Sequence, residues 1–489
     1  MSKQFLSIFV VSILSLCVAV SCVDEKFTTD PSAILHFSCD TLSFDTVFTT
    51  IPSRTLSFYV YNNNDRALKI SSVRLGRGQD SYFRFNFDGR LPGDANLLED
   101  IEIKANDSLF VFVELTVDPN ETDFPVFYMD SMVFITNGQT QDVKLVTYGQ
   151  DAIIFKGGSL TVNTTFTADK PYLFFGNFFV NEGITLTLDA GTHLYFHDKA
   201  NLVVNGNLVS NGTLENPVEM RTDRFDKMPD EDKTPYDYMP GQWGGIYLQN
   251  SKGSYLLNYT KIKNCDIGIV LVGDASNQPS LKVTNSVIHS MTQYGIYAQY
   301  GKLEISNTEI SNCGTSCLYI LGGESYVVHT TIANYYTWGT RENPSLVIAN
   351  YILNGNLLYL FPITSSVVEN SIVYGNLNTE IALQKDTFTN ATYNVLVSNT
   401  LLKARKTERD EYYNIIWSNS VNGLALSDTV FMNVSIRDIK TNGYYNFQLD
   451  QKSMARGKAN KAVAGRFPTD LLGKNRLFDG YPDLGAYEK

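Results

Sequence analysis

The sequence predicts an all-β chain in which a solenoid of stacked coils follows a separate β-sandwich. Segments of similar sequence begin at Asn285, Asn307, His329 and Asn350, at intervals of 22, 22 and 21 residues. The preceding region, residues 36–150, alternates apolar and polar residues without this period. Asn, Thr, Ser, Tyr and Phe are abundant and no long amphipathic helical pattern appears, which favours strands and turns.

Composition excludes one class of function. The chain has 489 residues, 43% of them hydrophobic and 18% charged, as in ordered proteins. Its formal net charge is −12. Sequence-independent binding of nucleic acid depends on Lys and Arg that neutralise phosphates, so we expect no nucleic-acid partner.

The first 21 residues have the pattern of a secretory signal. Lys3 precedes an apolar run from Phe5 to Val20, which is too short to span a membrane. The end of this run, Ala19-Val-Ser-Cys22, resembles a bacterial lipobox, although Ala19 stands where that family usually has Leu. The resemblance implies cleavage before Cys22, acylation of Cys22 and anchoring in outer-membrane lipid, with residues 22–35 as the lipidated cysteine and linker. An ordinary signal peptide with an incidental cysteine is the alternative.

The acidic pair in Val23-Asp-Glu resembles the surface-export signal of lipoproteins in the Bacteroides group. This resemblance implies a protein exposed on the outside of the outer membrane.

Residues 36–150 are expected to form an immunoglobulin-like sandwich. Half-buried strand patterns such as Thr55-Leu-Ser-Phe-Tyr-Val-Tyr and Ser108-Leu-Phe-Val-Phe-Val-Glu-Leu are separated by turn sequences such as Asn137-Gly. The spacing also resembles small sandwich modules of bacterial surface proteins. We interpret the module as a spacer that holds the next domain away from the membrane.

Residues 151–489 are expected to form the solenoid. Gly183-Ile-Thr-Leu-Thr-Leu and Asn201-Leu-Val-Val-Asn-Gly consist of short apolar strands broken by Gly and Asn turns. They closely resemble the opening coils of right-handed parallel β-helix proteins. The tail, with Asp470-Leu-Leu-Gly and Pro482-Asp-Leu-Gly-Ala-Tyr-Glu, resembles the closing segment of a Bacteroides-type subfamily. This resemblance implies that residues from about 445 to 489 cap the last coil.

The repeated asparagines are interpreted as a ladder that stabilises one corner of the coils. Its expected members are Asn285, Asn307, Asn350, Asn370 and Asn399, and His329 is expected to substitute for Asn within the ladder. A residue repeated in every coil is more often structural than catalytic.

The cysteines predict no metal site. Cys265 and Cys313 fall at matching positions of their repeats, which favours buried thiols. Cys313 and Cys317 could bridge across three residues, but no spacing has the paired Cys/His pattern of zinc sites. We therefore expect neither a metal nor a cofactor.

No catalytic residue can be assigned from the sequence. Hydrolases on this fold need two carboxylates at a fixed separation, and lyases need a Lys or Arg base, often beside calcium-binding acids. The paired acids of pectin hydrolases and the Arg-x-Pro-x-x-Arg of pectate lyases are both absent.

Two groups of aromatic residues indicate glycan contact. Tyr236 and Tyr238 crowd one insertion into the repeat, and Tyr335, Tyr336 and Trp338 crowd another. Exposed aromatic rings stack on sugar rings, and loops that project from a rigid scaffold often carry binding residues. The interruptions expected to hold binding residues are 221–243, 335–344 and 403–413.

The sequence thus favours a non-catalytic cell-envelope lipoprotein that binds extracellular polysaccharide or acts as an adhesin. The alternative is a polysaccharide lyase or glycoside hydrolase whose site residues are not identified. Basic and acidic side chains that converge from neighbouring coils would favour the enzyme, and aromatic residues on an open face would favour the binding protein.

Overall fold

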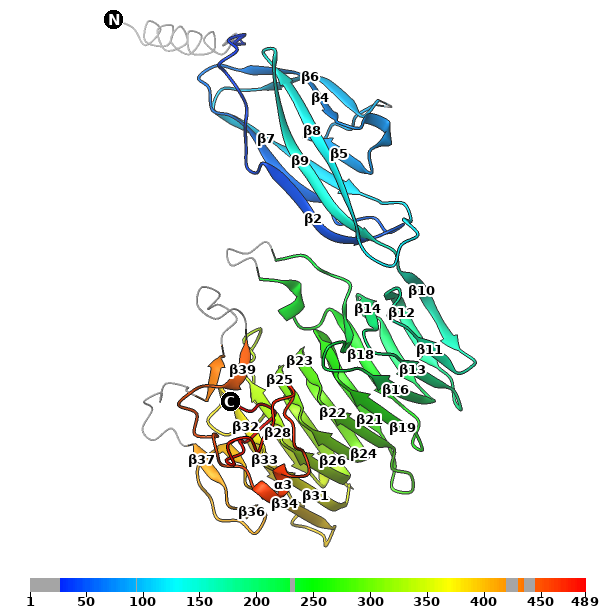
Figure 1. Ribbon diagram of the computed structural model, residues 1–489, viewed down its shortest axis with the longest axis vertical. Helices are drawn as coiled ribbons and strands as arrows, with labels where there is room; N and C mark the ends of the chain where they lie inside the picture. The colour runs from blue at the N-terminus through cyan, green and yellow to red at the C-terminus, as the bar shows by residue number, and fades with distance from the viewer. Residues whose placement is uncertain (1–26, 94, 229–233, 419–429, 435–444) are drawn as a thin grey trace, which may run out of the picture. The chain divides into compact units, whose positions relative to one another are not determined.

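The computed structural model describes residues 27–93, 95–228, 234–418, 430–434 and 445–489 (Figure 1). The predicted signal peptide and Cys22 lie outside these residues. The chain divides after Asp151 into two compact units, where the sequence analysis placed the boundary after residue 150. Each unit has its own apolar core.

The first unit contains two sheets that share one core. Phe58 and Val111 of the smaller sheet pack in the same cluster as Val73 and Phe134 of the larger sheet, which makes the unit a β-sandwich. All strand pairs in it are antiparallel except β2 with β9. The smaller sheet has the order β1 (His36–Phe37), β3 (Leu56–Asn62), β7 (Asp107–Leu115), β5 (Phe83–Phe87). The larger sheet has the order β2 (Thr41–Phe48), β9 (Gln139–Gln150), β8 (Val126–Thr136), β4 (Leu68–Leu75), β6 (Leu97–Ile103). The unit also contains the short 3-10 helix η1 (Gly78–Asp80).

The second unit is a parallel β-solenoid with three faces. Within its large sheet, strands pair in parallel with the equivalent strands of the next coil, so strands mostly about 20 to 40 residues apart in sequence lie side by side (Figure 1). The β10 (Ile153–Leu160) and β12 (Tyr172–Val180) strands run along the first face and then the second. The β24 (Tyr294–Ser306) and β26 (Ser316–Val328) strands run along the second face and then the third.

The remaining strands of the three faces are as follows. The first face holds β14 (His193–His197), β17 (Val218–Thr222), β20 (Thr260–Lys263), β23 (Val287–Met291), β25 (Glu309–Cys313), β27 (Thr331–Asn334), β32 (Ile372–Gly375), β35 (Leu401–Lys403) and β37 (Ile416–Ser418). The second face holds β15 (Asn201–Val204), β18 (Trp243–Leu248), β21 (Cys265–Val272), β28 (Leu346–Ala349) and β33 (Ile381–Gln384). The third face holds β11 (Thr164–Phe166), β13 (Thr185–Leu188), β16 (Asn207–Asn211), β19 (Ser254–Asn258), β22 (Ser280–Thr284), β31 (Ile363–Glu369), β34 (Tyr393–Ser398) and β36 (Tyr412–Tyr413).

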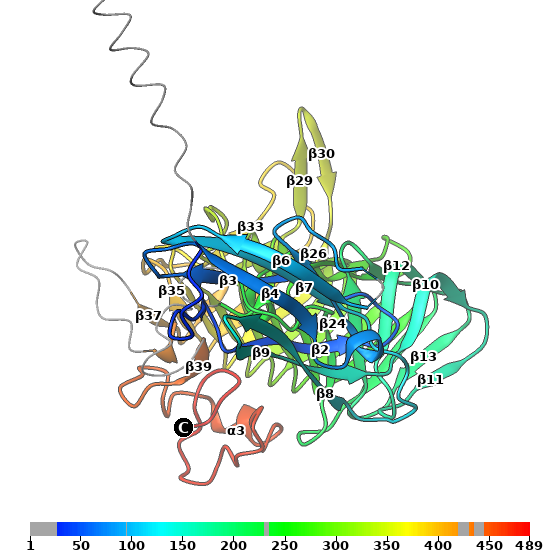
Figure 2. The ribbon, with the colours of Figure 1, turned by 90° about the horizontal axis from the view of Figure 1, so that it is seen from above.

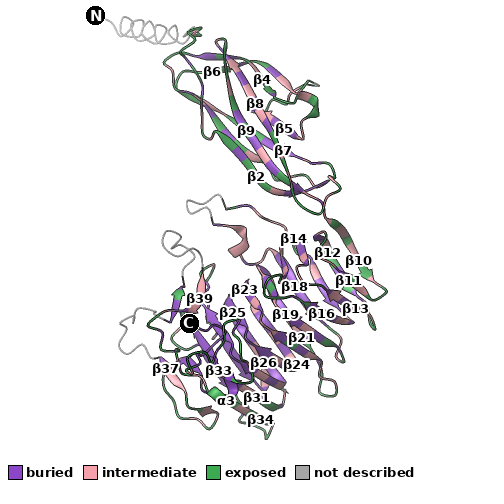
Figure 3. Cartoon of the chain, viewed as in Figure 1, coloured by how far each residue is buried: buried purple, intermediate pink, exposed green. Residues whose placement is uncertain are grey.

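Many residues of the solenoid strands are buried (Figure 3), and their apolar side chains form one core. Ile262, Ile288, Ile310 and Ile332 are in register on successive first-face strands, and none is more than 1% exposed. Because every coil places the same kind of residue at the same position, the core continues from coil to coil. Cys265 and Cys313 are buried free thiols, as predicted, and Cys317 is also a buried free thiol, so Cys313 and Cys317 form no bridge.

The asparagine ladder occupies the corner between the third and first faces. Asn285, Asn307, His329, Asn370 and Asn399 all have positive φ angles, between 44° and 50°. The Nδ2 of Asn307 donates to Oδ1 of Asn285 at 3.2 Å, and Nδ2 of Asn370 lies 3.1 Å from Nε2 of the buried His329. Asn tolerates the left-handed conformation better than most residues, so the prediction for these five positions is confirmed.

Asn350 does not belong to this ladder, and its assignment from the repeat was wrong. It follows β28, whose Ala349 pairs with Leu321, so Asn350 lies at the corner between the second and third faces. A hairpin of β29 (Tyr351–Asn354) and β30 (Leu357–Leu360) is inserted there. Because of this insertion, the ladder residue that follows His329 is Asn370, 41 residues later in the chain, and its Nδ2 donates to His329.

The tail is bound along the side of the solenoid. The N–H of Gly485 donates to the carbonyl of Asn370 at 2.9 Å, and that of Ala486 to Oγ1 of Thr331 at 2.9 Å. Nη2 of Arg476 donates to Oδ1 of Asn307 at 3.0 Å. These partners belong to middle coils, whereas the sequence placed the tail over the last coil. The tail includes β39 (Asn446–Leu449), which pairs with β38 (Phe431–Asn433), and α3 (Lys461–Ala464) (Figure 2).

Candidate functional site

The structure buries two of the predicted glycan-binding residues. Tyr335 is 7% exposed and packs between Phe431 and Phe447, with ring centroids 6.2 and 6.0 Å away. Tyr336 is 9% exposed. The structure contradicts the predicted glycan contact by these two residues: chain segments that contain Phe431 and Phe447 cover Tyr335, and the burial of Tyr336 leaves little of its ring for a sugar. Trp338 is half-buried and stays a prediction.

Arg341 holds the 335–344 loop against the coils. Its guanidinium forms a bidentate ion pair with Glu380, and the two side chains are 1% and 0% exposed. Glu380 also accepts hydrogen bonds from Oγ and N of Ser345 and from N of Leu377. Such a buried, multiply hydrogen-bonded pair fixes the loop against the coils.

Tyr236 and Tyr238 lie in the short 3-10 helix η2 (Tyr236–Tyr238) and are half-buried. The guanidinium of Arg224 lies 3.4 Å from the ring centroid of Tyr236 and therefore occupies one face of that ring. The ring of Tyr238 lies 6.0 Å from His289 and 6.4 Å from Tyr445. Sugar stacking by these two residues stays a prediction.

Charged side chains from neighbouring coils meet beneath η2. Nζ of Lys263 lies 2.5 Å from Oε1 of Glu219 and 3.2 Å from Oδ2 of Asp237. Asp237 also pairs with Arg221 at 3.2 Å, and Glu219 with His193 at 3.4 Å. We call Glu219, Arg221, Asp237 and Lys263 the charged cluster.

The charges in this cluster compensate one another. Burial alone would raise the pKa of Glu219, but the hydrogen bond from His193 and the ammonium of Lys263 hold that pKa well below its usual range. Burial lowers the pKa of the adjacent His289 to about 4, so this imidazole is neutral at pH 7. The cluster therefore pairs two carboxylates with one shared lysine, an arrangement that ties η2 to the coils.

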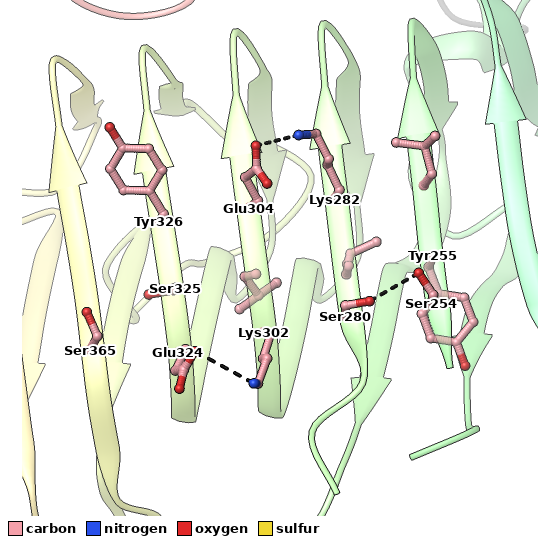
Figure 4. Close-up of a pocket in the computed structure, with 13 residues that line it drawn as sticks. Ser254, Tyr255, Ser280, Lys282, Lys302, Glu304, Glu324, Ser325, Tyr326 and Ser365 are labelled. Carbon is pink, nitrogen blue, oxygen red and sulfur yellow. Dashed lines mark hydrogen bonds and ion pairs between the residues drawn. The ribbon is translucent and has the colours of Figure 1, made fainter. Parts of the chain in front are cut away.

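The third face carries an open groove of about 620 Å³ (Figure 4). It crosses β19, β22, β24, β26 and β31. Its polar and aromatic lining consists of four serines, two lysines, two glutamates and two tyrosines: Ser254, Ser280, Ser325, Ser365, Lys282, Lys302, Glu304, Glu324, Tyr255 and Tyr326. We call this surface the polar groove.

Register aligns these side chains in two rows. One row contains Ser254, Ser280, Lys302 and Glu324 from successive coils. The other contains Lys282, Glu304 and Tyr326. Neighbouring parallel strands are about 4.8 Å apart, so each row presents a polar group to the groove at that interval.

Opposite charges pair along both rows, as Figure 4 shows. Nζ of Lys282 lies 2.6 Å from Oε1 of Glu304, and Nζ of Lys302 lies 4.0 Å from Oε2 of Glu324. The four side chains are 45–54% exposed, so water or a ligand competes for them. The groove is consequently polar but electrically balanced.

The tail contributes to one end of the groove. Nη2 of Arg466 donates to the hydroxyl of Tyr326 at 2.7 Å and to Oε1 of Glu369 at 3.1 Å. The Tyr326 hydroxyl also donates to Glu369. Burial and the bond to Glu369 raise the pKa of Tyr326, which keeps its hydroxyl protonated.

Sequence reasoning missed the groove, although a signal was present. Residues 280, 302 and 324 lie 22 apart, as do 282, 304 and 326. These positions are polar or aromatic and alternate with apolar residues such as Leu281 and Leu303. Attention to the outward positions of the repeat, in addition to its asparagines, would have found them.

A comparison with protein families decides the classification. The profile described as right handed beta helix region matches residues 131–332 and 274–443. The chain belongs to this family. The β-helix therefore has the predicted fold class, with a β-sandwich before it.

Comparisons with individual proteins are less informative. A search of the curated proteins finds no match. A protein of unknown function from Porphyromonas gingivalis W83 aligns with 26% of this chain and 59% of its own, at 13% identity and a TM-score of 0.19. The chain thus spans less than two thirds of that protein. A family 123 glycoside hydrolase from Clostridium perfringens aligns over 25% of this chain and 26% of its own, at 8% identity and a TM-score of 0.18. A PapD-like domain of human CEP192 aligns over 27% of this chain and 96% of its own, at 9% identity and a TM-score of 0.18.

Two searches of the described residues bear on anchoring and metals. None of the helices in the described ranges is long and apolar enough to cross a membrane. Those same ranges contain no group of three or more His, Cys, Asp or Glu side chains arranged to hold a metal ion.

Proposed function

We propose that the β-helix binds extracellular glycan along the polar groove and does not cleave it. The observation that carries the proposal is the pair of polar rows that crosses several coils at a fixed interval. A glycan is a regular chain of hydroxyl groups, so a regular series of hydroxyl, ammonium and carboxylate groups can bond successive sugars. The groove volume, about 620 Å³, is within the range of small-ligand sites.

Rigidity supports the same proposal. The groove side chains stand on strands of a continuous parallel sheet, with buried residues such as Leu281 and Ile305 beneath them. A preformed site loses little conformational entropy when a ligand binds. The lysine–glutamate pairs hold both partners extended along the sheet, where either can exchange its bond for one to a sugar hydroxyl.

A polysaccharide lyase or glycoside hydrolase is the second candidate, and the charged cluster is the observation that favours it. Glu219 and Asp237 both reach Nζ of Lys263, so two carboxylates and a base converge from different segments. A hydrolase, however, needs one carboxylic acid that carries a proton, and a lyase needs a base able to accept one. Pairing with the shared ammonium of Lys263 disfavours both a protonated carboxylic acid and a free base. We therefore prefer binding without cleavage.

We also propose that acylated Cys22 anchors the protein to the outer membrane, with the β-helix outside the cell. The support is the sequence of residues 3–25 alone. Cys22→Ala is expected to release the protein from the membrane fraction into the soluble fraction. Continued partition of that variant into membranes would contradict the lipid anchor.

Affinity electrophoresis of residues 23–489 tests the groove directly. Gels would contain neutral or uronate-containing plant polysaccharides or host glycosaminoglycans, one per gel. We expect at least one polysaccharide to retard the wild type, and Lys302→Ser together with Glu304→Ser to abolish most of the retardation. The matched control is Lys69→Ser with Asp100→Ser, an exposed ion pair of the sandwich with a 2.8 Å separation. Equal retardation of the groove variant and the wild type would overturn the assignment.

A further inference from the structure

A second open surface lies on the second face of the β-helix, where three tyrosine rings meet. The rings of Tyr297 and Tyr319 are nearly parallel, with centroids 5.4 Å apart and planes at 20°. Tyr294 lies 5.4 Å from Tyr297 and 5.7 Å from Tyr319, and its plane is inclined to theirs by 58° and 76°. All three are half-buried. We call this group the tyrosine face.

The β29–β30 hairpin stands beside the tyrosine face. It leaves the coils between β28 and β31 and projects away from them (Figure 2). Ile352 and Phe361, at its base, pack against the same buried residues as Tyr297 and Tyr319. The hydroxyl of Tyr300 donates to the carbonyl of Leu360 at 2.8 Å, which fixes the hairpin to the corner of the coil.

The hairpin presents apolar and aromatic side chains to solvent. Leu353, Leu357 and Tyr359 are 55%, 61% and 48% exposed. The segment from Tyr351 to Pro362 contains no charged residue. Exposed strands usually carry charges that prevent unwanted pairing, so a hairpin of this length without one indicates a binding role.

Within the described part of the chain, the hydroxyls of Tyr294, Tyr297 and Tyr319 make no hydrogen bond. Burial raises the pKa of Tyr319 to about 12, so its hydroxyl is protonated and able to donate at physiological pH. Tyr297 and Tyr319 each cover one ring face of the other, so their edges and hydroxyls are the groups we consider for binding, whereas Tyr359 offers exposed ring surface.

We propose that the tyrosine face and the hairpin form a second saccharide site, which binds the pyranose rings of an uncharged glycan. An uncharged sugar ring supplies both things that this surface can use: C–H groups for Tyr359 and Leu357, and hydroxyls for the three tyrosines. The absence of charge from the hairpin disfavours an ionic ligand. A lipid surface fits less well, because Asn354 and Asn356 flank the turn of the hairpin and the tyrosine hydroxyls would lose water without gaining partners.

The site does not depend on the polar groove, since the two occupy different faces. Tyr294 and Glu304 belong to the same strand, β24, but lie on either side of the corner at Tyr300. A long glycan could contact both surfaces, and a short one would report on each separately.

Isothermal titration calorimetry with two hexasaccharides tests the proposal. The probes are a hexamer of β-linked glucose and a hexamer of galacturonate, added to residues 23–489. We expect the glucose hexamer to bind more tightly than the galacturonate hexamer. Tyr359→Ala and Leu357→Ser, both at exposed positions, should each weaken it by roughly three- to tenfold. Phe478→Ala, which removes a 90% exposed ring from the tail, is the control and should change nothing.

The hydroxyl contribution is tested by Tyr319→Phe combined with Tyr297→Phe, which preserves ring packing and should weaken binding by about tenfold. Unchanged affinity in the hairpin and tyrosine variants, or tighter binding of the galacturonate hexamer, would overturn the proposal. If only the Lys302→Ser and Glu304→Ser variant loses the glucose hexamer, the groove assignment stands and this one fails. If only the hairpin variants lose it, this site stands and the groove assignment fails.

Two further outcomes would also overturn it. One is flotation of the wild type, but not Leu357→Ser, with phosphatidylcholine vesicles, which would identify a lipid surface as the partner. The other is a dimer in analytical ultracentrifugation that Leu357→Ser dissociates, which would identify a second copy of the chain.

Discussion

Single residues at the corner between the third and first faces have two tasks. Asn307 turns the chain with a φ of 48° and donates from Nδ2 to Oδ1 of Asn285. It also binds the tail, because it donates to the carbonyl of Thr469 at 3.0 Å and accepts from Arg476. The residue therefore couples the stacking of coils to the attachment of the tail.

Asn307→Ala is expected to lower the free energy of unfolding by about 2–4 kcal/mol, the sum of left-handed backbone strain and lost hydrogen bonds. Asn307→Gly tolerates the positive φ and should cost about 1 kcal/mol less. Chemical denaturation measures both values. The control is Asn356→Ala at the exposed hairpin turn, expected within about 0.5 kcal/mol of wild type. Equal stability of the Ala and Gly variants would show that the backbone conformation matters little.

Glu488 makes stability depend on pH. Burial and the neighbouring Asp483 raise its pKa from 4.5 to about 8. A folded pKa above the unfolded one means that the stabilisation is full below pH 4.5 and is lost as pH rises through about 8. Glu488→Gln has no titratable group at this position. Between pH 4.5 and pH 8.5 the wild type should therefore lose more unfolding free energy than the variant.

Each unit of pKa difference corresponds to about 1.4 kcal/mol. Urea denaturation of the wild type and Glu488→Gln at pH 4.5 and pH 8.5 measures the difference in their unfolding free energies. A difference that is the same at both values would contradict the assignment to Glu488.

Sequence reasoning predicted the corner asparagines but not the burial of Tyr335 and Tyr336. A positive φ at Asn is a local property that recurs with the repeat, so the sequence contains it. The burial of Tyr335 depends on Phe431 and Phe447, about 100 residues later in the chain. No local pattern indicates which distant segment covers a residue.

At the scale of elements, insertions between strands distinguish one coil from another. The segment after β17 is held by the charged cluster, the 335–344 loop by Arg341, and the hairpin by Tyr300. Sequence analysis located the first two as interruptions of the repeat. It missed the hairpin because Asn350-Tyr-Ile-Leu has the same pattern as the repeat, although it begins the insertion.

Lys263→Met is expected to destabilise the β-helix by about 2–3 kcal/mol, since it leaves Glu219 and Asp237 without their shared cation in a half-buried place. Lys282→Met removes a similar lysine from an exposed pair and should cost less than about 1 kcal/mol. Thermal unfolding of the two variants compares them. The opposite result would be a wild type that cleaves glycan and a Lys263→Met variant that is equally stable but does not. That result would identify Lys263 as part of a catalytic site.

At the scale of the whole molecule, two independent cores predict two independent folding units. The sandwich core and the solenoid core share no residue. We expect residues 27–151 and 152–489 to fold separately, and calorimetry of each to reproduce one transition of the full chain. A fragment without a cooperative transition would show that the boundary after Asp151 is not a folding boundary.

The fold class could be predicted from the sequence because every coil of a solenoid repeats the same pattern of residues. The 22-residue period, the inward isoleucines and the Asn corner are all statements about one coil, and the stack follows from them. The binding surfaces were not readable in the same way. They are formed by outward positions of several coils together with insertions, and their geometry appears only once the register between coils is known.

The central claim is that the β-helix binds glycan without cleaving it. The most direct test incubates residues 23–489 with each polysaccharide that retards the protein in a gel, and then measures both bound protein and released sugar. The account predicts saturable binding with no new reducing ends and no unsaturated products. Release of either product, or the absence of binding to every polysaccharide of the panel, would contradict it.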